Sequence, residues 1–152
     1  MRRLQAICIG LTLLLVAGAA GCGEGEAAGG ASVSIYVAAP LCREARKGLA
    51  AAGGKAGGLD VRAVCLAGIA SGGRADLAVA GGNARRASED STAVAYLEAP
   101  GPAAKFTRSI VAAAKIAWIE TGSGSAVVRR VLRALEGRGS SSPRSAVLDQ
   151  VG

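Results

Sequence analysis

From residue 33 onward, apolar positions follow two alternating spacings. Short runs rich in β-branched and aromatic residues predict strands, and apolar residues three or four positions apart predict the helices between them. A strand, a helix and a second strand in this order form a βαβ unit, whose strands are parallel. The expected fold is one doubly wound, Rossmann-like α/β domain over residues 33–137, a parallel sheet of about four strands with flanking helices. The strands are expected over residues 33–38, 59–66, 92–97 and 116–119, and the helices over 43–52, 76–88, 103–114 and 125–136.

Glycine and proline interrupt this pattern in three places. Gly81 and Gly82 fall inside the second predicted helix, where each costs about 1 kcal/mol relative to alanine, so a short strand over residues 75–80 is the alternative. Residues 98–102 include two prolines and predict a rigid loop. Residues 138–152 are rich in serine and include Pro143, so we expect a flexible tail with a short helical turn over 146–151.

The first 22 residues have the pattern of an export signal. Two arginines precede an apolar stretch over residues 4–17, and small residues then lead to Cys22. The segment Ala-Ala-Gly-Cys at 19–22 resembles the lipobox of bacterial lipoproteins, which implies cleavage before Cys22 and attachment of lipid to it. We therefore expect a signal peptide over 1–21, a flexible spacer over 22–32, and lipid anchoring at the extracytoplasmic face of the cell membrane. The alternatives are an ordinary secreted protein and an uncleaved membrane helix, although the apolar stretch is short for a span.

Composition narrows the range of functions. Cleavage before Cys22 leaves 152 − 21 = 131 residues, and removing Arg2 and Arg3 lowers the net charge from +7 to +5. Lysine and arginine are scattered rather than clustered, so the pattern predicts no nucleic-acid partner. The sequence contains no histidine, which excludes histidine-based triads and the commonest metal ligand. We expect no enzymatic activity, no catalytic residues, no metal and no cofactor.

The cysteines predict one disulfide bond. Cys8 leaves with the signal and Cys22 takes the lipid, so Cys42 and Cys65 remain as a pair in an oxidising compartment. Cys42 follows the carboxyl end of the first predicted strand and Cys65 lies near that end of the second, and in neighbouring parallel strands those ends point the same way. A bond between them closes a loop of about 24 residues and contributes about 3 kcal/mol in the chain-entropy model. The alternative is a reactive thiol pair, but the spacing is not that of a Cys-x-x-Cys motif.

Three segments together carry a resemblance to a known family. Residues 33–40, 51–64 and 83–96 resemble the first lobe of extracellular solute-binding lipoproteins of branched-chain amino-acid ABC transporters, which have the type I periplasmic binding fold. In that family two α/β lobes close over an amino acid or similar solute, and loops after the third and fourth strands of the first lobe contribute contacts. The resemblance places those loops at residues 98–102 and 121–125 and leaves the second lobe absent. It gives as ligand-binding candidates Glu98, Thr121, Gly122, Ser123 and Ser125.

Each candidate also has a simpler interpretation. The hydroxyls at 121, 123 and 125 precede a helix amino terminus, where they either contact a carboxylate or only cap the helix. The Gly122-x-Gly124 pattern matches part of a dinucleotide fingerprint, but Val127 occupies the third glycine position, which favours a plain turn. Glu98 and Glu120 are either a paired-carboxylate site or solvated loop residues. We interpret Trp118 as a core anchor.

These observations favour a lipoprotein that binds a small solute weakly, an amino acid or another carboxylate. Its expected partners are the membrane, through the lipid, and an ABC transporter permease or a second-lobe protein that completes the cleft. The alternatives are a non-enzymatic envelope protein that uses the half-fold as a partner surface, and a truncated paralogue without activity.

Overall fold

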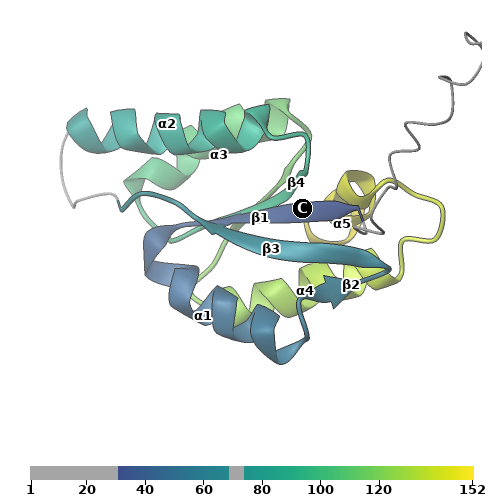
Figure 1. Ribbon diagram of the computed structural model, residues 1–152. Helices are drawn as coiled ribbons and strands as arrows, with labels where there is room; N and C mark the ends of the chain where they lie inside the picture. The colour runs from purple at the N-terminus through teal and green to yellow at the C-terminus, as the bar shows by residue number, and fades with distance from the viewer. Residues whose placement is uncertain (1–30, 69–73) are drawn as a thin grey trace, which may run out of the picture.

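The computed structural model describes residues 31–68 and 74–152, and it shows an α/β fold built on a mixed five-stranded sheet (Figure 1). The strand order is β2-β3-β1-β4-β5; β1, β3, β4 and β5 are parallel, and the short β2 pairs antiparallel with β3. The predicted signal peptide, Cys22 and most of the spacer lie outside the described residues. The elements are β1 (Ser32–Val37), α1 (Ala39–Ala51), β2 (Lys55–Ala56), β3 (Leu59–Cys65), α2 (Arg74–Glu89), β4 (Ala93–Glu98), α3 (Pro102–Ala113), β5 (Ala117–Glu120), α4 (Gly124–Glu136) and α5 (Pro143–Val151).

The helices cover the two faces of the sheet in pairs. Helices α1 and α4 pack together on one face, α2 and α3 pack together on the other, and α5 lies against α4, β4 and β5 (Figure 1). The chain passes from β1 outward to β3, and then crosses back over β1 to β4. This reversal of direction confirms the doubly wound fold class and places its switch point between β1 and β4. Among the described residues, no helix combines the length and apolar character needed to cross a membrane.

The core consists of two apolar layers, one on each side of the sheet. The larger layer lies between the sheet and α1, α4 and α5, and the smaller lies under α2 and α3. Strand β4 is buried at all six positions, as expected for a central parallel strand covered on both faces. Many of the fully buried side chains are small, which lets the helices pack close to the sheet. They are Ala45, Ala80, Ala84, Ala87, Ala93, Ala95, Ala117 and Ala134.

Most predicted elements are confirmed within a few residues, and the differences have local causes. Helix α1 begins at Ala39, four residues before the predicted start. Pro40 fits in the first turn, because N–H groups there have no partner within the helix and proline loses nothing by lacking one. The sequence analysis missed β2, which pairs with β3 across a turn where Gly57 and Gly58 have φ of +56° and +78°. Such positive φ angles cost glycine little.

Helix α2 runs through Gly81 and Gly82, so the alternative strand over residues 75–80 is wrong. A Cβ built on Gly81 would lie 3.1 Å from Cε1 of Phe106 on α3. The absence of a side chain there lets α2 approach α3 closely. This tertiary contact offsets the low helix propensity of glycine.

The chain after residue 138 differs from the flexible tail that the sequence analysis expects. Helix α5 is nine residues long, and Ala146, Val147 and Val151 are buried on its inner side. The backbone N–H of Ser145 donates to Oγ of Ser142, which caps the helix. The serine-rich composition concealed a short stripe of apolar residues that covers the end of the larger core layer.

Arg144 fastens α5 to the rest of the domain. Its Nε donates to the carbonyl oxygen of Ala93 at 2.9 Å, and Nη1 donates to that of Ala114 at 3.2 Å. Its Nη2 donates to the carbonyls of Asp90 and Ser91, each at 3.1 Å. One guanidinium group therefore joins α5 to the start of β4 and the end of α3, using donors that are charged and stronger than neutral ones.

We predict that Gly124→Ala destabilises the domain by about 1–3 kcal/mol, because the new Cβ overpacks the contact between α4 and α1. A Cβ built on Gly124 would lie 2.7 Å from the carbonyl oxygen of Leu41 and 3.1 Å from the backbone nitrogen of Ala45. The control is Gly122→Ala, since a Cβ there meets nothing within 4 Å. Urea unfolding measures both, and equal stability of the two variants would contradict the proposed role of this contact.

Candidate functional site

The switch point gives the sheet one edge that is suited to binding. In open α/β sheets, ligands bind outside the carboxyl ends of the strands where the strand order reverses. Here the segments that follow β1, β4 and β5 meet at that edge and are joined through their backbones. The N–H of Ala38 donates to the carbonyl of Leu97 at 2.9 Å, and the N–H of Thr121 donates to that of Glu98 at 2.9 Å. The candidate site is this carboxyl edge.

The segment from β5 to α4 forms a tight turn at the carboxyl edge. Oγ1 of Thr121 accepts from the backbone N–H of Ser123 at 3.0 Å and lies 3.3 Å from the carbonyl oxygen of the same residue. Ser123 is the N-cap of α4, but its side chain makes no capping hydrogen bond. Thr121 therefore stabilises the turn, while the Ser123 hydroxyl is not used for capping.

The two remaining candidates of this turn have different surroundings. Gly122 is exposed, and a Cβ there would have open space around it. Ser125 is half-buried beside α1, where a Cβ built on Gly48 would come within 3.2 Å of Ser125 Cβ. Gly124 lies in the same contact between α1 and α4. The Gly-x-Gly pattern thus has a packing explanation, and it does not require a phosphate.

Glu98 has its backbone at the carboxyl edge, but its side chain is buried and bonded within the protein. The side chain packs under α3, and the residue is 3% exposed. Its carboxylate accepts from the backbone N–H of Ala99 at 3.2 Å, and Oε2 lies 3.2 Å from Oγ1 of Thr107. Burial raises the pKa of Glu98, and the neighbouring Glu120 adds to that increase, although hydrogen bonds from Thr107 and Ala99 oppose it.

Glu98 and Glu120 are register partners on β4 and β5, so the strands that carry them are neighbours. Glu98 is buried, whereas Glu120 is exposed. Over residues 31–68 and 74–152, no group of three acidic or cysteine side chains is placed to hold a metal ion. The role of Glu98 in ligand binding stays a prediction.

The disulfide bond between Cys42 and Cys65 is confirmed. It joins the first turn of α1 to the last residue of β3, with the two Cα atoms 5.6 Å apart. The bond therefore fixes the start of α1 against the sheet beside the carboxyl edge.

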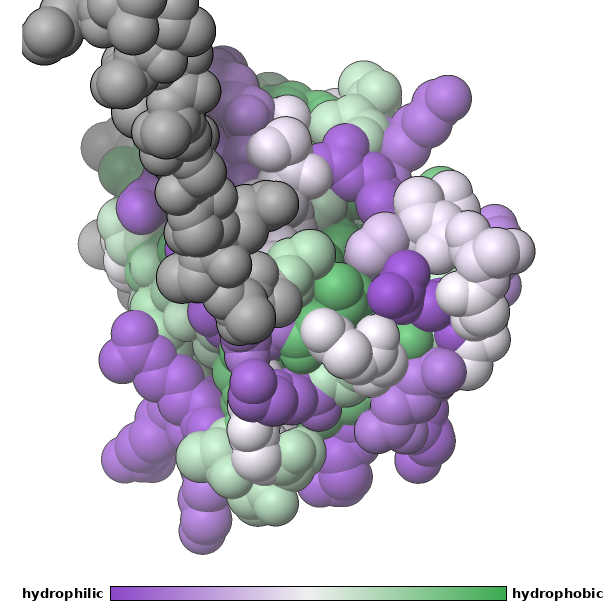
Figure 2. All heavy atoms as spheres, turned by 45° about the vertical axis from the view of Figure 1, so that its right-hand side comes forward, coloured by the Kyte–Doolittle hydropathy of each residue, from purple (hydrophilic) through white to green (hydrophobic). Residues whose placement is uncertain are grey.

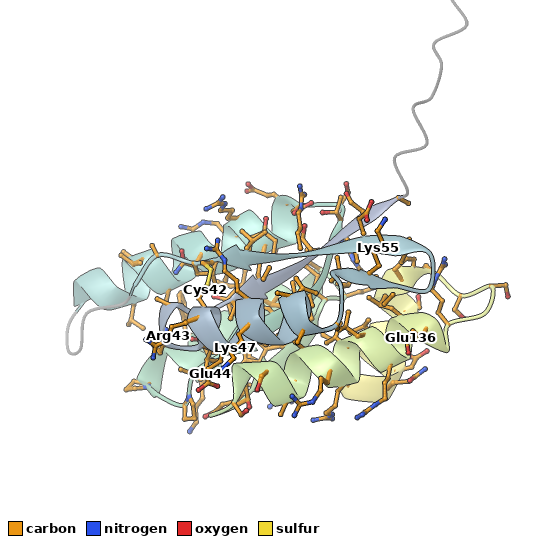
Figure 3. All side chains as sticks on the ribbon, turned by 60° about the horizontal axis from the view of Figure 1, so that its bottom comes forward. Cys42, Arg43, Glu44, Lys47, Lys55 and Glu136 are labelled. Carbon is orange, nitrogen blue, oxygen red and sulfur yellow. A yellow bond between two sulfur atoms is a disulfide. The ribbon has the colours of Figure 1, made fainter. Side chains whose placement is uncertain are left out.

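Basic side chains gather on the outer face of α1 and α4, which the sequence analysis read as scattered charge. Figure 3 shows this face, with Arg43, Glu44 and Lys47 of α1 beside α4. Exposed carboxylates on the two helices are limited to Glu44 and Glu136. The exposed basic residues are Arg43, Arg46, Lys47, Arg129, Arg130 and Arg133. The pairing of the two helices brings these charges together, and no spacing within either helix predicts that pairing.

A second polar network lies at the opposite end of the strands and was also missed. Asp90 accepts from the Tyr36 hydroxyl at 2.9 Å, from the Thr92 hydroxyl at 2.7 Å and from the Thr92 N–H at 2.8 Å. Burial alone would raise the pKa of Asp90, but these hydrogen bonds outweigh it and hold that pKa below its usual value. Arg62 joins the network through Ser34 at 2.8 Å. The sequence did contain a signal for this network, because Ser34 and Tyr36 are polar residues at alternate positions of a buried strand.

Comparisons with known proteins identify no family for this chain. No protein-family model matches it, and neither the curated proteins nor the solved structures give a significant match. The structure supports an α/β domain with a mixed five-stranded sheet, and the resemblance to solute-binding lipoproteins stays a prediction.

We predict that replacing Cys42 and Cys65 together with serine lowers the free energy of unfolding by about 3 kcal/mol, because the unfolded chain regains the entropy of an open loop. Urea unfolding of the oxidised protein and of the variant measures the difference. Reduction of the unchanged protein with dithiothreitol should produce a similar loss. Equal stability of all three samples would show that the bond does not stabilise the fold.

Proposed function

We propose that this protein is an extracytoplasmic lipoprotein that binds a small carboxylate-bearing solute, such as an amino acid, at the carboxyl edge. In this proposal it is a one-lobe relative of the solute-binding proteins of amino-acid ABC transporters. The observation that carries the proposal is the turn before α4. It lies at the carboxyl edge, and the Ser123 hydroxyl there makes no capping hydrogen bond at the amino terminus of α4.

The chemistry of this turn suits a carboxylate. The first backbone N–H groups of a helix have no partner within the helix, and the helix dipole favours negative charge there. Helix α4 has no acidic residue in its first turn to occupy those groups. The start of α4 lies beside the first two turns of α1, since Gly124 packs against Leu41 and Ala45.

One lobe leaves a bound solute open to water on one side. Good small-molecule sites bury most of the ligand surface, so the affinity of this lobe alone should be weak. We propose that a transporter permease or a second-lobe partner covers the solute and completes the site.

The proposed lipid at Cys22 and the basic face of α1 and α4 both favour a location at the membrane surface. Anionic headgroups attract exposed arginine and lysine, each worth about 1 kcal/mol near a charged membrane surface. A domain tethered by the short spacer over residues 22–32 stays within reach of that surface. Figure 2 shows another face of the domain, with hydrophilic side chains around its rim and apolar and intermediate residues at its centre.

A second function has one observation in its favour. Leu77 and Val79 on α2 and Phe106 on α3 are 43%, 37% and 42% exposed. Exposed large apolar side chains on adjacent helices are typical of surfaces that bind other proteins. The alternative is therefore a non-enzymatic envelope protein that uses the face of α2 and α3 for a protein partner.

We predict that an amino acid or small carboxylate raises the melting temperature of the purified protein. Ligand at about 100 times its dissociation constant stabilises the fold by about 2.7 kcal/mol, which corresponds to several degrees in a small domain. Thr121→Ala and Ser123→Ala should each abolish the shift, because the first loosens the turn and the second removes the hydroxyl.

Ser140→Ala is the matched control, since Ser140 is exposed and lies far along the chain from this turn. A shift that survives both site substitutions would place the ligand elsewhere. A folded protein that shifts with none of the amino acids, small carboxylates or polyamines tested would favour the protein-partner function.

We predict that the protein incorporates fatty acid at Cys22 when it is expressed in a bacterial host. Cys22→Ser should abolish both the fatty-acid label and retention in the membrane fraction, whereas Cys8→Ser should retain both, because Cys8 leaves with the signal peptide. Labelling with a fatty-acid analogue and cell fractionation provide the measurements. Unchanged labelling of the Cys22→Ser variant would refute the lipid anchor.

A further inference from the structure

The basic face of α1 and α4 carries a concentration of positive charge. It holds the six exposed basic residues named above and two exposed carboxylates, Glu44 and Glu136, so six positive charges stand against two negative ones, a net charge of +4. The salt bridges found among the described residues both involve β3, and neither includes a residue of this face. Its charge is therefore available to a partner outside the domain.

The basic face is two helices wide. Helices α1 and α4 lie side by side, and the start of α4 packs against the first two turns of α1 (Figure 3). Arg43 and Lys47 are four residues apart on α1, so both project from one side of that helix. Arg129 and Arg133 have the same spacing on α4. The buried residues of both helices face the sheet, so these four charges lie together on the outer surface.

The side chains of the basic face suit phosphate groups. All of the six except Lys47 are arginines, whose planar guanidinium groups bind phosphate through two parallel hydrogen bonds. Clusters of about four to eight basic residues on a helical surface are typical of sites for anionic lipid headgroups. The large apolar side chains that are exposed among the described residues lie on α2, α3 and α5 instead. The basic face therefore fits the charged headgroup layer of a membrane and not its hydrocarbon interior.

The length of chain before β1 favours a membrane over an acidic protein as the partner. In the proposed lipoprotein, 32 − 22 = 10 residues separate the lipid at Cys22 from Ser32, where β1 begins. A fully extended chain of that length spans at most about 35 Å, so the headgroups stay within reach of the domain. A tethered partner has a high effective concentration, whereas an acidic protein in solution has to be recruited.

We propose that the basic face docks on anionic phospholipid headgroups and fixes the orientation of the domain: α1 and α4 face the bilayer, and α2 and α3 face away from it. This inference rests on the membrane location in the proposed function, and it adds an orientation that a flexible lipid tether alone does not impose. The strands run beside α1 and α4 (Figure 1), so the carboxyl edge opens along the membrane surface and not into it.

Lysine labelling tests this orientation, because exposed lysines lie on both sides of the sheet. Lys47 is on the basic face, and Lys105 is on α3. The full chain, with residues 1–21 retained, is reconstituted into vesicles of phosphatidylcholine alone or with added phosphatidylglycerol, and the vesicles are recovered by flotation. A water-soluble acylating reagent that does not cross membranes then labels the lysines. Mass spectrometry gives the ratio of labelling at Lys47 to labelling at Lys105.

We expect phosphatidylglycerol, at about one third of the lipid, to lower this ratio at least about 3-fold, because the docked face excludes the reagent. About 1 M salt should restore the ratio, since it shortens the screening length to about 3 Å. Only vesicle-bound protein is labelled and no solute is present, so failure of the solute site or of lipid attachment at Cys22 would not change the result. An unchanged ratio would overturn the proposal and favour an acidic protein partner, and a higher ratio would place α2 and α3 on the lipid instead.

Two matched double variants identify the charges that act. Arg129→Gln with Arg130→Gln removes two consecutive exposed arginines from α4 and leaves Lys47 in place, so the ratio should return toward its value on phosphatidylcholine. Arg85→Gln with Arg86→Gln removes the same charge from consecutive exposed positions of α2, and the ratio should stay low. Equal effects of the two pairs would show that the net charge of the protein, and not the basic face, governs binding, and would overturn the proposal.

Discussion

The pairing of β1 with β3 on one side and β4 on the other is the interaction on which the rest of the structure depends. Parallel strands cannot be joined by a tight turn, so each pairing requires a crossover helix. The two crossovers lie on opposite faces, and each face is then covered. The same reversal sends the helix after β1 and the helix after β4 to opposite faces of the sheet, and both helices start at the carboxyl edge. Fold and candidate site therefore have one topological origin.

The sequence predicted the elements whose apolar spacing is regular, and it failed where distant contacts decide the structure. The four main strands and four helices follow from period and turn residues. Gly81 disfavours a helix locally, yet the close approach of Phe106 makes it suitable. Helix α5 lacks a strong amphipathic signal, and its burial depends on the surface that α4 and β4 present. Neither contact can be derived from the neighbouring sequence.

The candidate site was predicted in the same uneven way. The disulfide followed from cysteine count and strand direction, and the turn at Thr121 and Ser123 followed from its place between a strand and a helix. Glu98 was placed correctly at a strand end, but its side chain lies under α3 rather than free at the edge. The partner that holds it, Thr107, occupies a position in the otherwise apolar inner stripe with Ala104 and Val111. A threonine in such a stripe fits packing as well as a polar role, so the sequence gives no reason to prefer the second.

Arg144 has a consequence for the order in which the chain can fold. Its guanidinium donates hydrogen bonds to residues 90–93, more than fifty positions earlier. The apolar side chains of α4 and α5 complete the core layer that lies between the sheet and α1. During synthesis, the chain must emerge past residue 144 before these contacts form. A nascent chain that stops short of α5 therefore lacks Val147 and Val151, the last part of the larger core layer.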